Sequence, residues 1–175
     1  MAETRLDAFS PREKLNKMAV DLIDVTLTTI VGEHADNIVV SQSIEIPNAV
    51  AVKGGSAIIQ SIYLQSTDND VESPALELIF AAENTALRSS DVIEDSEITD
   101  GNLVGAVIQG STTVSNWSTL TPSENEFAVK TNIGLVVRAE SDSRSIFVHT
   151  VNRSGSSFNP SGTGKLTARI GIIKD

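Results

Sequence analysis

The chain has 175 residues, of which 40% are hydrophobic, 21% are charged and only 4% are aromatic, a balance that favours one globular domain and excludes a disordered chain. The absence of cysteine excludes disulfides and thiolate metal sites. No run of residues approaches the roughly 20 apolar residues of a membrane helix, and the charged N-terminus predicts no secretory signal, so we expect no membrane partner.

The net charge of −10 is unevenly spread along the chain. Residues 1–20 carry four basic and three acidic side chains, whereas residues 66–100 carry ten carboxylates and a single arginine, Arg88. Because such an acidic surface repels phosphate backbones, we expect no nucleic-acid partner.

The first predicted element is a helix near residues 11–22. Ser10 can cap it, Pro11 suits its first position, and Glu13 completes a capping box. Apolar side chains then follow at spacings of three and four and define one face: Leu15, Met18, Ala19 and Leu22. We therefore divide the chain into an N-terminal arm with an amphipathic helix, residues 1–23, and a β-sandwich domain, residues 24–175.

Beyond the helix, the apolar period shortens from about 3.6 residues to about 2, which predicts strands. Ten candidates follow, at residues 25–30, 38–46, 49–52, 57–65, 75–81, 103–109, 126–130, 133–139, 145–151 and 165–173. In the last of these, one side is wholly apolar: Leu166, Ala168, Ile170 and Ile172. The strand at 145–151 is apolar on both sides, which predicts cover on both faces.

The segments between these strands read as turns and loops. Lys53–Ser56 and Ser141–Ser143 have the length of hairpin turns, and Asn152–Gly164 is rich in Ser, Gly and Asn, which predicts an exposed loop. Short strands with turns at regular intervals predict an all-β fold, namely an antiparallel β-sandwich, jelly-roll-like, with a short N-terminal α-helix.

The polar residues form no recognisable catalytic arrangement. No Gly-x-Ser-x-Gly turn accompanies the two histidines, and His149 fits a packed or surface strand residue better than a general base. The run Gly162–Lys165 resembles a phosphate loop, but Asn159 stands where that motif needs glycine and Leu166 where it needs Ser or Thr. We therefore expect no enzyme and no cofactor.

Two further features each allow two interpretations. Asp68, Asp70 and Glu72 could offer oxygen ligands to calcium, although Ser73 replaces the glycine of an EF-hand loop and a polar hairpin tip explains the same residues. Trp117 could stack on a sugar or could anchor a half-buried loop.

Several segments resemble a group of tailed-bacteriophage virion proteins, especially those of marine phages. They cover about two thirds of the chain in consistent order: IEIPNAVAVKGGSAIIQSIYLQ at 44–65, ALELIFAAENTAL at 75–87, LVGAVIQG at 103–110, TNIGLVVRAE at 131–140, then SIFVHTVNRSG and the closing KLTARIGIIKD. The resemblance implies a phage structural protein, and within that class a capsid decoration (cement) protein. It implies the major capsid protein as partner, the capsid surface of the virion as location after synthesis in the host cytoplasm, and no catalytic residues.

The helical arm lies outside the strongest resemblance, so its role is inferred from its chemistry. Its apolar face and its basic side chains suit docking on the capsid or on a neighbouring subunit, with these contacts: Arg12, Leu15, Lys17, Met18 and Leu22. The alternative is that this helix packs on its own sandwich. Because decoration proteins often sit at local symmetry axes, we expect a small homo-oligomer, with a trimer favoured over a dimer.

The alternative function is a tail-associated or fibre adhesin domain that binds host glycan, for which Trp117 or the Asn152–Gly164 loop would serve. A third interpretation is a carbohydrate-binding module separated from a larger enzyme.

Overall fold

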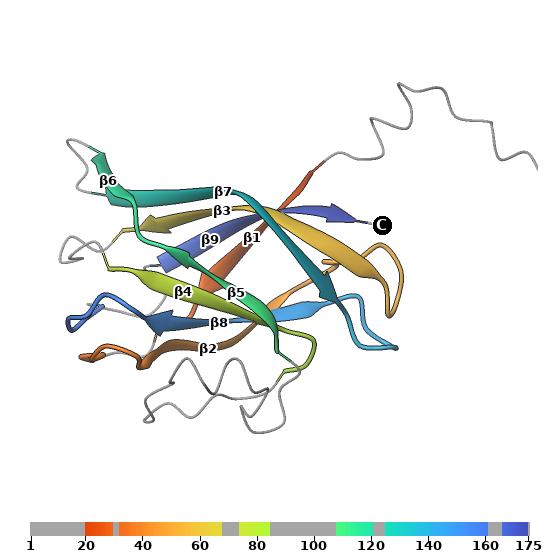
Figure 1. Cartoon of the computed structure of the whole chain (residues 1–175), viewed down its shortest axis with the longest axis horizontal. Helices are drawn as coiled ribbons and strands as arrows, with labels where there is room; N and C mark the ends of the chain where they lie inside the picture. Colours follow the sequence, from red (N-terminus) through yellow and green to blue (C-terminus); the bar gives the residue numbers. More distant parts are fainter. Residues whose placement is uncertain are drawn as a thin grey trace, which may run out of the picture.

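The computed structural model is an all-β domain of two antiparallel sheets packed face to face (Figure 1). It describes residues 20–29, 32–67, 74–84, 108–120, 125–160 and 166–174. Nine strands lie in these ranges: β1 (Asp21–Leu27), β2 (Val39–Ile46), β3 (Ser56–Ser66), β4 (Leu76–Ala81), β5 (Ile108–Val114), β6 (Trp117–Leu120), β7 (Asn125–Arg138), β8 (Ile146–Asn152) and β9 (Leu166–Lys174).

The strand order identifies the topology. One sheet has the order β1-β9-β3-β7-β6 and the other has the order β2-β8-β4-β5. Pairing is nested from the outside of the chain inward, because β1 pairs with β9, β2 with β8, β3 with β7, and β4 with β5, all antiparallel. Such a rolled-up ribbon of eight strands in two sheets is a jelly roll, to which β6 adds an edge strand. The predicted jelly-roll-like sandwich is confirmed.

The core lies between the sheets and is filled mainly by Ile, Leu and Val. The predicted inward side of β9 is confirmed, because Leu166, Ala168, Ile170 and Ile172 are all buried. Each fully buried Ile or Leu side chain contributes roughly 1.5–3 kcal/mol relative to exposure. Strand β8 lies between β2 and β4, and its second face is also covered: His149 and Val151 are fully buried. The predicted cover on both faces of this strand is therefore confirmed.

At the N-terminus, the structure corrects the predicted helix over residues 11–22. Strand β1 begins at Asp21, where Asp21 pairs with Ile172 and Leu22 pairs with Gly171. Leu22 fits a helical face with Met18, but in a strand it lies on the same side as Asp24 and opposite to Ile23, and pairing with β9 decides between the two patterns. The rest of the predicted helix lies outside the described residues.

Two predicted strands, 126–130 and 133–139, are one continuous strand, β7. Asn132 and Gly134 have positive φ of 57° and 67°, and they mark the irregularity between the pairs Ser61↔Thr131 and Ile59↔Leu135. The polar pair of Thr131 and Asn132 is typical of a turn, but here it forms a bulge that keeps both halves of the strand paired with β3.

The predicted strand at 49–52 is wrong, because these residues are the turn that carries the chain from β2 in one sheet to β3 in the other. Ala49 and Val50 are buried there, which explains their apolar pattern, and the Val50 amide donates to the Arg144 carbonyl at 3.1 Å.

Neither of the two predicted hairpin turns forms a hairpin in the structure. The turns at Lys53–Ser56 and Ser141–Ser143 both connect strands of different sheets, and they lie together at one end of the sandwich. The Gly54 amide donates to the Ser143 carbonyl at 2.9 Å, and the Ala139 amide donates to the Gly55 carbonyl at 3.1 Å. A crossing between sheets can be as short as a hairpin, so loop length did not distinguish them.

Strand β5 is described from Ile108 and continues to Val114, five residues beyond the predicted end at Gln109. Strand β6 was not predicted, because its Ser- and Thr-containing segment shows no clear alternation.

Candidate interaction surface

The exposed apolar side chains of the described residues gather on the outer face of the five-stranded sheet, meaning the face directed away from the core. Six large hydrophobic side chains are exposed in this part of the chain. Strand alternation and pairing place five of them on the outer face: Val20, Leu22, Ile58, Val129 and Val136. The sixth, Val52, lies in the turn between β2 and β3.

Four strands contribute to an apolar ridge on this face, which we define as Val20, Leu22, Ile58, Val136 and Ile173. Ile58 of β3 pairs with Val136 of β7 on one side and with Ile173 of β9 on the other. At the other end of the ridge is Gly171, where a Cβ would overlap Ser61 Oγ of β3 and would lie 3.0 Å from Val20 Cγ1. The missing side chain leaves room for the Ser61 hydroxyl and for Val20 at the start of β1.

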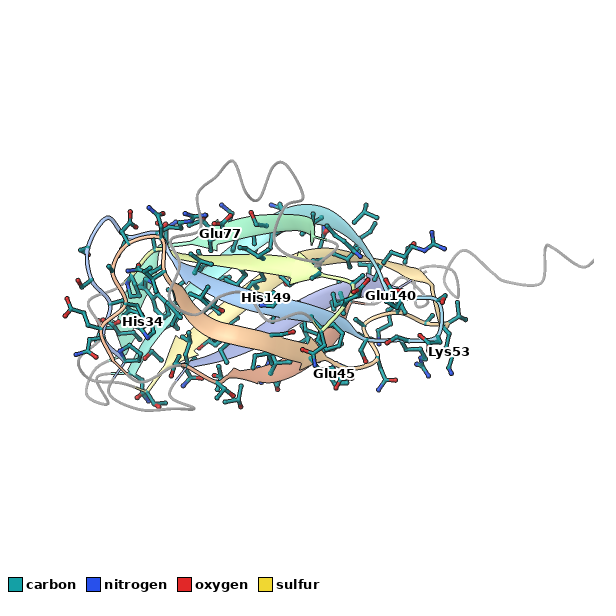
Figure 2. All side chains as sticks on the ribbon, turned by 90° about the horizontal axis from the view of Figure 1, so that it is seen from below. His34, Glu45, Lys53, Glu77, Glu140 and His149 are labelled. Carbon is teal, nitrogen blue, oxygen red and sulfur yellow. The ribbon has the colours of Figure 1, made fainter. Side chains whose placement is uncertain are left out.

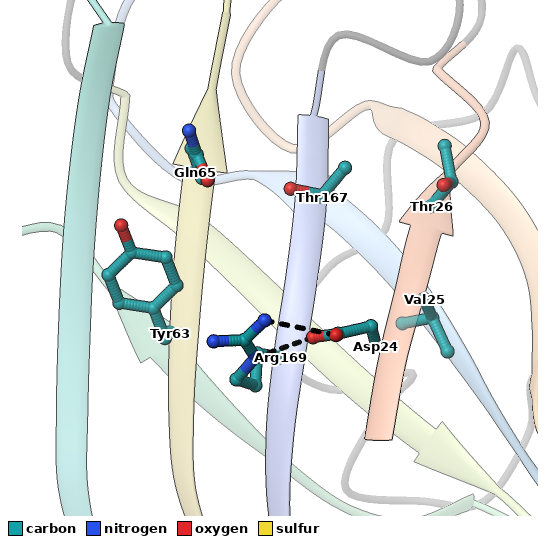
Figure 3. A pocket seen from close by; sticks show the side chains of 7 residues that line it. All are labelled: Asp24, Val25, Thr26, Tyr63, Gln65, Thr167 and Arg169. Atoms are coloured by element: carbon teal, nitrogen blue, oxygen red, sulfur yellow. Dashed lines mark hydrogen bonds and ion pairs between the residues drawn. The ribbon is translucent and has the colours of Figure 1, made fainter. Parts of the chain in front are cut away.

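Beside the ridge is a groove of about 530 Å³, shown in Figure 3. Its lining is mixed, with one aromatic ring among polar groups: Asp24, Val25, Thr26, Tyr63, Gln65, Thr167 and Arg169. The Tyr63 ring stacks on Phe127 of β7, with ring centroids 5.9 Å apart and an interplanar angle of 19°. The stacking restrains the Tyr63 ring on one wall of the groove.

A bidentate ion pair between β1 and β9 lies in the groove. Arg169 Nε and Nη2 donate to Asp24 Oδ1 and Oδ2 at 2.6 and 3.0 Å (Figure 3). The hydrogen bond from Arg169 lowers the pKa of Asp24, and the same bond raises the pKa of Arg169. Both side chains are more than half exposed, so water screens the pair and it adds little to stability. The pair neutralises the Asp24 carboxylate on this face by a positive charge from the same chain.

A second polar cluster ties together β4, β5 and two loops, and it includes Glu77 (labelled in Figure 2). Arg153 Nε donates to Glu77 Oε2 at 2.7 Å, and Ser111 donates its hydroxyl proton to the other carboxylate oxygen. Arg153 Nη1 also donates to Asn37 Oδ1. Glu77 is buried and both of its oxygens accept hydrogen bonds, so the cluster holds strands and loops together.

His149 lies near the middle of β8 (Figure 2) and is fully buried. Neither ring nitrogen has a hydrogen-bond partner, and burial lowers the pKa of His149 to about 4. The imidazole is therefore neutral at pH 7 and out of contact with solvent, which excludes it as a general base for an external substrate. Of the two strand environments expected for His149, packed or surface, the structure shows the packed one.

Of the five predicted contact residues, the structure describes only Leu22. It lies on the outer face and is 63% exposed, at the point where the predicted arm joins the sheet. The other four, Arg12, Leu15, Lys17 and Met18, lie outside the described residues, so their role stays a prediction.

The two features considered for glycan binding are partly anchored in the fold. Trp117 is half-buried in β6 and donates its indole proton to the Pro74 carbonyl at 2.6 Å, as expected of an anchor. The predicted exposed loop Asn152–Gly164 is corrected at three positions, because Asn152 is fully buried in β8, Phe158 is buried beside His34, and Pro160 is also buried. Local composition could not reveal these three buried residues.

The predicted calcium ligands Asp68, Asp70 and Glu72 and the glycine run at 162–165 lie outside the described residues. Within the described ranges, no group of three His, Cys, Asp or Glu side chains could hold a metal ion. No helix in the same ranges is both long and apolar enough to span a membrane.

Sequence reasoning missed the outer face, although its signal was present. Ile58 and Val136 each adjoin an inward residue, Ile59 and Val137, so both strands are apolar on two sides. Cover on both sides is predicted only for the strand at 145–151. In β3 and β7 the second apolar side is exposed instead. The local sequence does not distinguish an exposed apolar side from a covered one.

Comparisons with known proteins leave the family open. No protein-family model matches the chain, and no curated protein matches it. The solved structures that overlap include a virus-like particle of the nodavirus of the giant freshwater prawn Macrobrachium rosenbergii, with 9% identity, 90% of this chain and 96% of that chain covered, and a TM-score of 0.31. A maize chlorotic mottle virus structure overlaps with 11% identity, coverage of 87% and 92%, and a TM-score of 0.27.

A mud crab tombus-like virus structure overlaps with 10% identity, coverage of 89% and 81%, and a TM-score of 0.21. The fold assignment rests on the strand pairing of this chain.

Proposed function

We propose that this chain is a non-enzymatic structural protein of a phage particle, and specifically a decoration (cement) protein that binds the outer surface of the head and stabilises it. The observation that carries the proposal is the concentration of exposed apolar side chains on one face of a jelly roll. A monomeric soluble protein rarely leaves such a patch open to water unless a partner covers it.

Attachment through such a face needs no chemical step. A specific interface buries about 800 Å² on each partner, and an apolar ridge flanked by polar groups has the composition of one. The partner in this role is the major capsid protein. The predicted arm, residues 1–23, would extend the attachment region, because Leu22 already lies on the outer face.

The groove supports the alternative function, an adhesin domain that binds host glycan. It sets the Tyr63 ring beside hydroxyl, amide and charged groups, which is a suitable lining for a sugar. This site differs from the Trp117 and Asn152–Gly164 sites expected from sequence. A glycan array tests it: a hit that is lost in Tyr63→Ala would favour the adhesin.

The decoration proposal is tested by adding the purified chain to heads that lack it. We expect saturable binding at hundreds of copies per particle and heads that withstand a higher temperature. Removing residues 1–19 leaves β1 intact, so weaker binding by this variant would assign the arm to the capsid contact. Absence of binding to the heads, or only a few copies at the tail, would contradict the decoration role.

A further inference from the structure

The groove beside the apolar ridge combines an aromatic ring with hydroxyl, amide and internally paired charged groups. We propose that it binds an uncharged saccharide, with Tyr63 as the ring on which the sugar stacks and the Asp24–Arg169 pair as the group that hydrogen-bonds its hydroxyls. The inference rests on the alternative function given above, for which it names the class of glycan, and it is independent of attachment to a head.

The groove is built from two rows of residues that pair across three neighbouring strands of the five-stranded sheet. In one row Arg169 of β9 pairs with Asp24 of β1 and with Tyr63 of β3, and the other row has the same strands in another order: Thr26, Thr167 and Gln65. The central pair of the ridge, Ile58 and Ile173, lies toward the opposite ends of β3 and β9. A ligand in the groove and a partner on that pair therefore occupy different parts of the face.

The Tyr63 ring is held in position by the fold itself. One side of it stacks on Phe127, with the two ring planes only 19° apart. Phe127 does not line the groove, so the groove presents the remaining surface of the Tyr63 ring (Figure 3). The C–H groups of a sugar ring form an apolar face that is complementary to such a surface. A side chain that is already held also loses little freedom when a ligand binds.

The Asp24–Arg169 pair offers both donors and acceptors, and a sugar hydroxyl can use both. Only two of the N–H groups of the guanidinium bind Asp24, and each carboxylate oxygen accepts one of these bonds, so both partners keep further hydrogen-bonding capacity. The Arg169 and Asp24 side chains are 51% and 67% exposed, which leaves these groups within reach of a ligand. The Gln65 amide and two threonine hydroxyls in the same groove also both donate and accept.

The charge of the groove favours an uncharged ligand over an acidic one. Asp24 and Arg169 are the charged residues among those that line it, and each neutralises the other. A carboxylated sugar would have to displace Asp24 from Arg169, in a chain whose net charge of −10 repels anions. An uncharged saccharide leaves the pair intact. The groove volume of about 530 Å³ lies within the range of roughly 300–1,000 Å³ that is typical of small-ligand sites.

The test is a glycan array on which uncharged oligosaccharides stand beside the same oligosaccharides carrying sialic or uronic acid. We expect the full chain to bind uncharged members and to bind their acidic forms about 10-fold more weakly. Tyr63→Ala should weaken binding by about 10-fold or more, because the stacking surface is gone, whereas Tyr63→Phe keeps the ring and should retain most of the binding. Circular dichroism shows whether each variant is folded, and Gln65→Ala gives a second disruption of the groove if Tyr63→Ala is not.

A charge variant tests the role assigned to the ion pair. Asp24→Asn removes the carboxylate that neutralises Arg169, so we expect binding of the acidic glycans to rise by about 10-fold. Asp21→Asn is the matched control, because Asp21 lies on the same strand and pairs with Lys174 at 2.6 Å but does not line the groove. This control changes the net charge by the same amount and should leave the glycan preference unchanged.

Four results would overturn the inference: no bound glycan, a preference for the acidic forms, unchanged binding by a folded Tyr63→Ala variant, or an equal gain in acidic binding by Asp21→Asn and Asp24→Asn. Each is distinct from failure of the decoration role, which is measured by binding of the chain to heads. A chain that binds heads but no glycan refutes the saccharide site alone. A chain that binds uncharged glycans but no heads supports the saccharide site and contradicts decoration.

Discussion

Gln109 of β5 joins the two sheets by hydrogen-bonding its side-chain amide to both backbone groups of Arg138 in β7. Its Nε2 donates to the Arg138 carbonyl at 2.6 Å, and its Oε1 accepts from the Arg138 amide. The side chain thus takes the place that a neighbouring strand would have at the end of β7, and it closes one edge of the jelly roll.

Replacing Gln109 with Ala removes both hydrogen bonds. Because the site is exposed and water replaces the lost partners, we expect the free energy of unfolding to fall by only about 1 kcal/mol. Urea unfolding measures this difference. Thr113→Ala, at an exposed position of the same strand, is the control, and an equal effect of the two substitutions would contradict the assigned role of Gln109.

Gly110, the next residue, lets β5 approach Leu135 of β7. Its φ is +148°, and a Cβ on it would lie 2.5 Å from Leu135 Cδ1. We expect Gly110→Ala to destabilise the fold by about 2 kcal/mol, through backbone strain and this overlap together. Gly155→Ala, also at positive φ but with open space around it, should cost less because only the backbone is strained.

The overlap between a Cβ at position 110 and Leu135 leads to a second prediction, on the coupling of the two residues. In the variant that combines Gly110→Ala with Leu135→Ala, the steric part of the cost disappears, so the loss of stability should be smaller than the sum of the two single losses. Strict additivity in this cycle would show that the two residues do not press on each other.

Asn152 holds two loops together from inside the fold. Its amide nitrogen donates to the carbonyls of His34 at 2.9 Å and Ser156 at 2.7 Å, and its carbonyl accepts from the Ser154 amide at 3.1 Å. Asn152→Ala removes three hydrogen bonds from a fully buried position, and we expect the free energy of unfolding, measured by thermal or urea unfolding, to fall by about 3 kcal/mol.

Two variants sharpen this prediction. Asn152→Asp should be more destabilising than Asn152→Ala at pH 7, because a carboxylate cannot donate and would face carbonyl oxygens. Asn159→Ala, at an exposed position of the same connection, should change stability by less than about 0.5 kcal/mol. A mild effect of Asn152→Asp would mean that the loops are held by other contacts.

His149 makes stability depend on pH in a defined window. Its pKa is about 4 in the folded chain against 6.5 for the free side chain, so between these values the unfolded chain binds a proton that the folded chain does not. Its contribution is therefore complete above pH 6.5 and is lost as the pH falls toward 4, by up to about 1.4 kcal/mol for each pH unit.

Leucine at this position removes the titrating group and its unpartnered nitrogens. We expect His149→Leu to reduce the loss of stability between pH 7.5 and pH 5 by about 2 kcal/mol relative to the unsubstituted chain. Urea unfolding at the two pH values gives the comparison, in which the carboxylates common to both proteins cancel. Parallel stability profiles of the variant and the unsubstituted chain would show that His149 is protonated equally in the folded and unfolded states.

The sequence determined the local pattern of this protein, because alternation of apolar side chains is a property of neighbouring residues. Leu166, Ala168 and Ile170 predicted the inward side of β9, and the two apolar sides of β8 predicted its cover on both faces. The same alternation, with frequent turn residues, was enough to predict a jelly-roll-like sandwich.

Tertiary structure alone decided which sheet each strand joined and which faces met water. Asp24 and Arg169 are 145 positions apart, and only the pairing of β1 with β9 brings them into one ion pair. Ile58 and Val136 likewise became part of an exposed ridge because no described strand covers that side. Burial and strand pairing depend on contacts between distant residues, so local periodicity predicts the strands but not their neighbours.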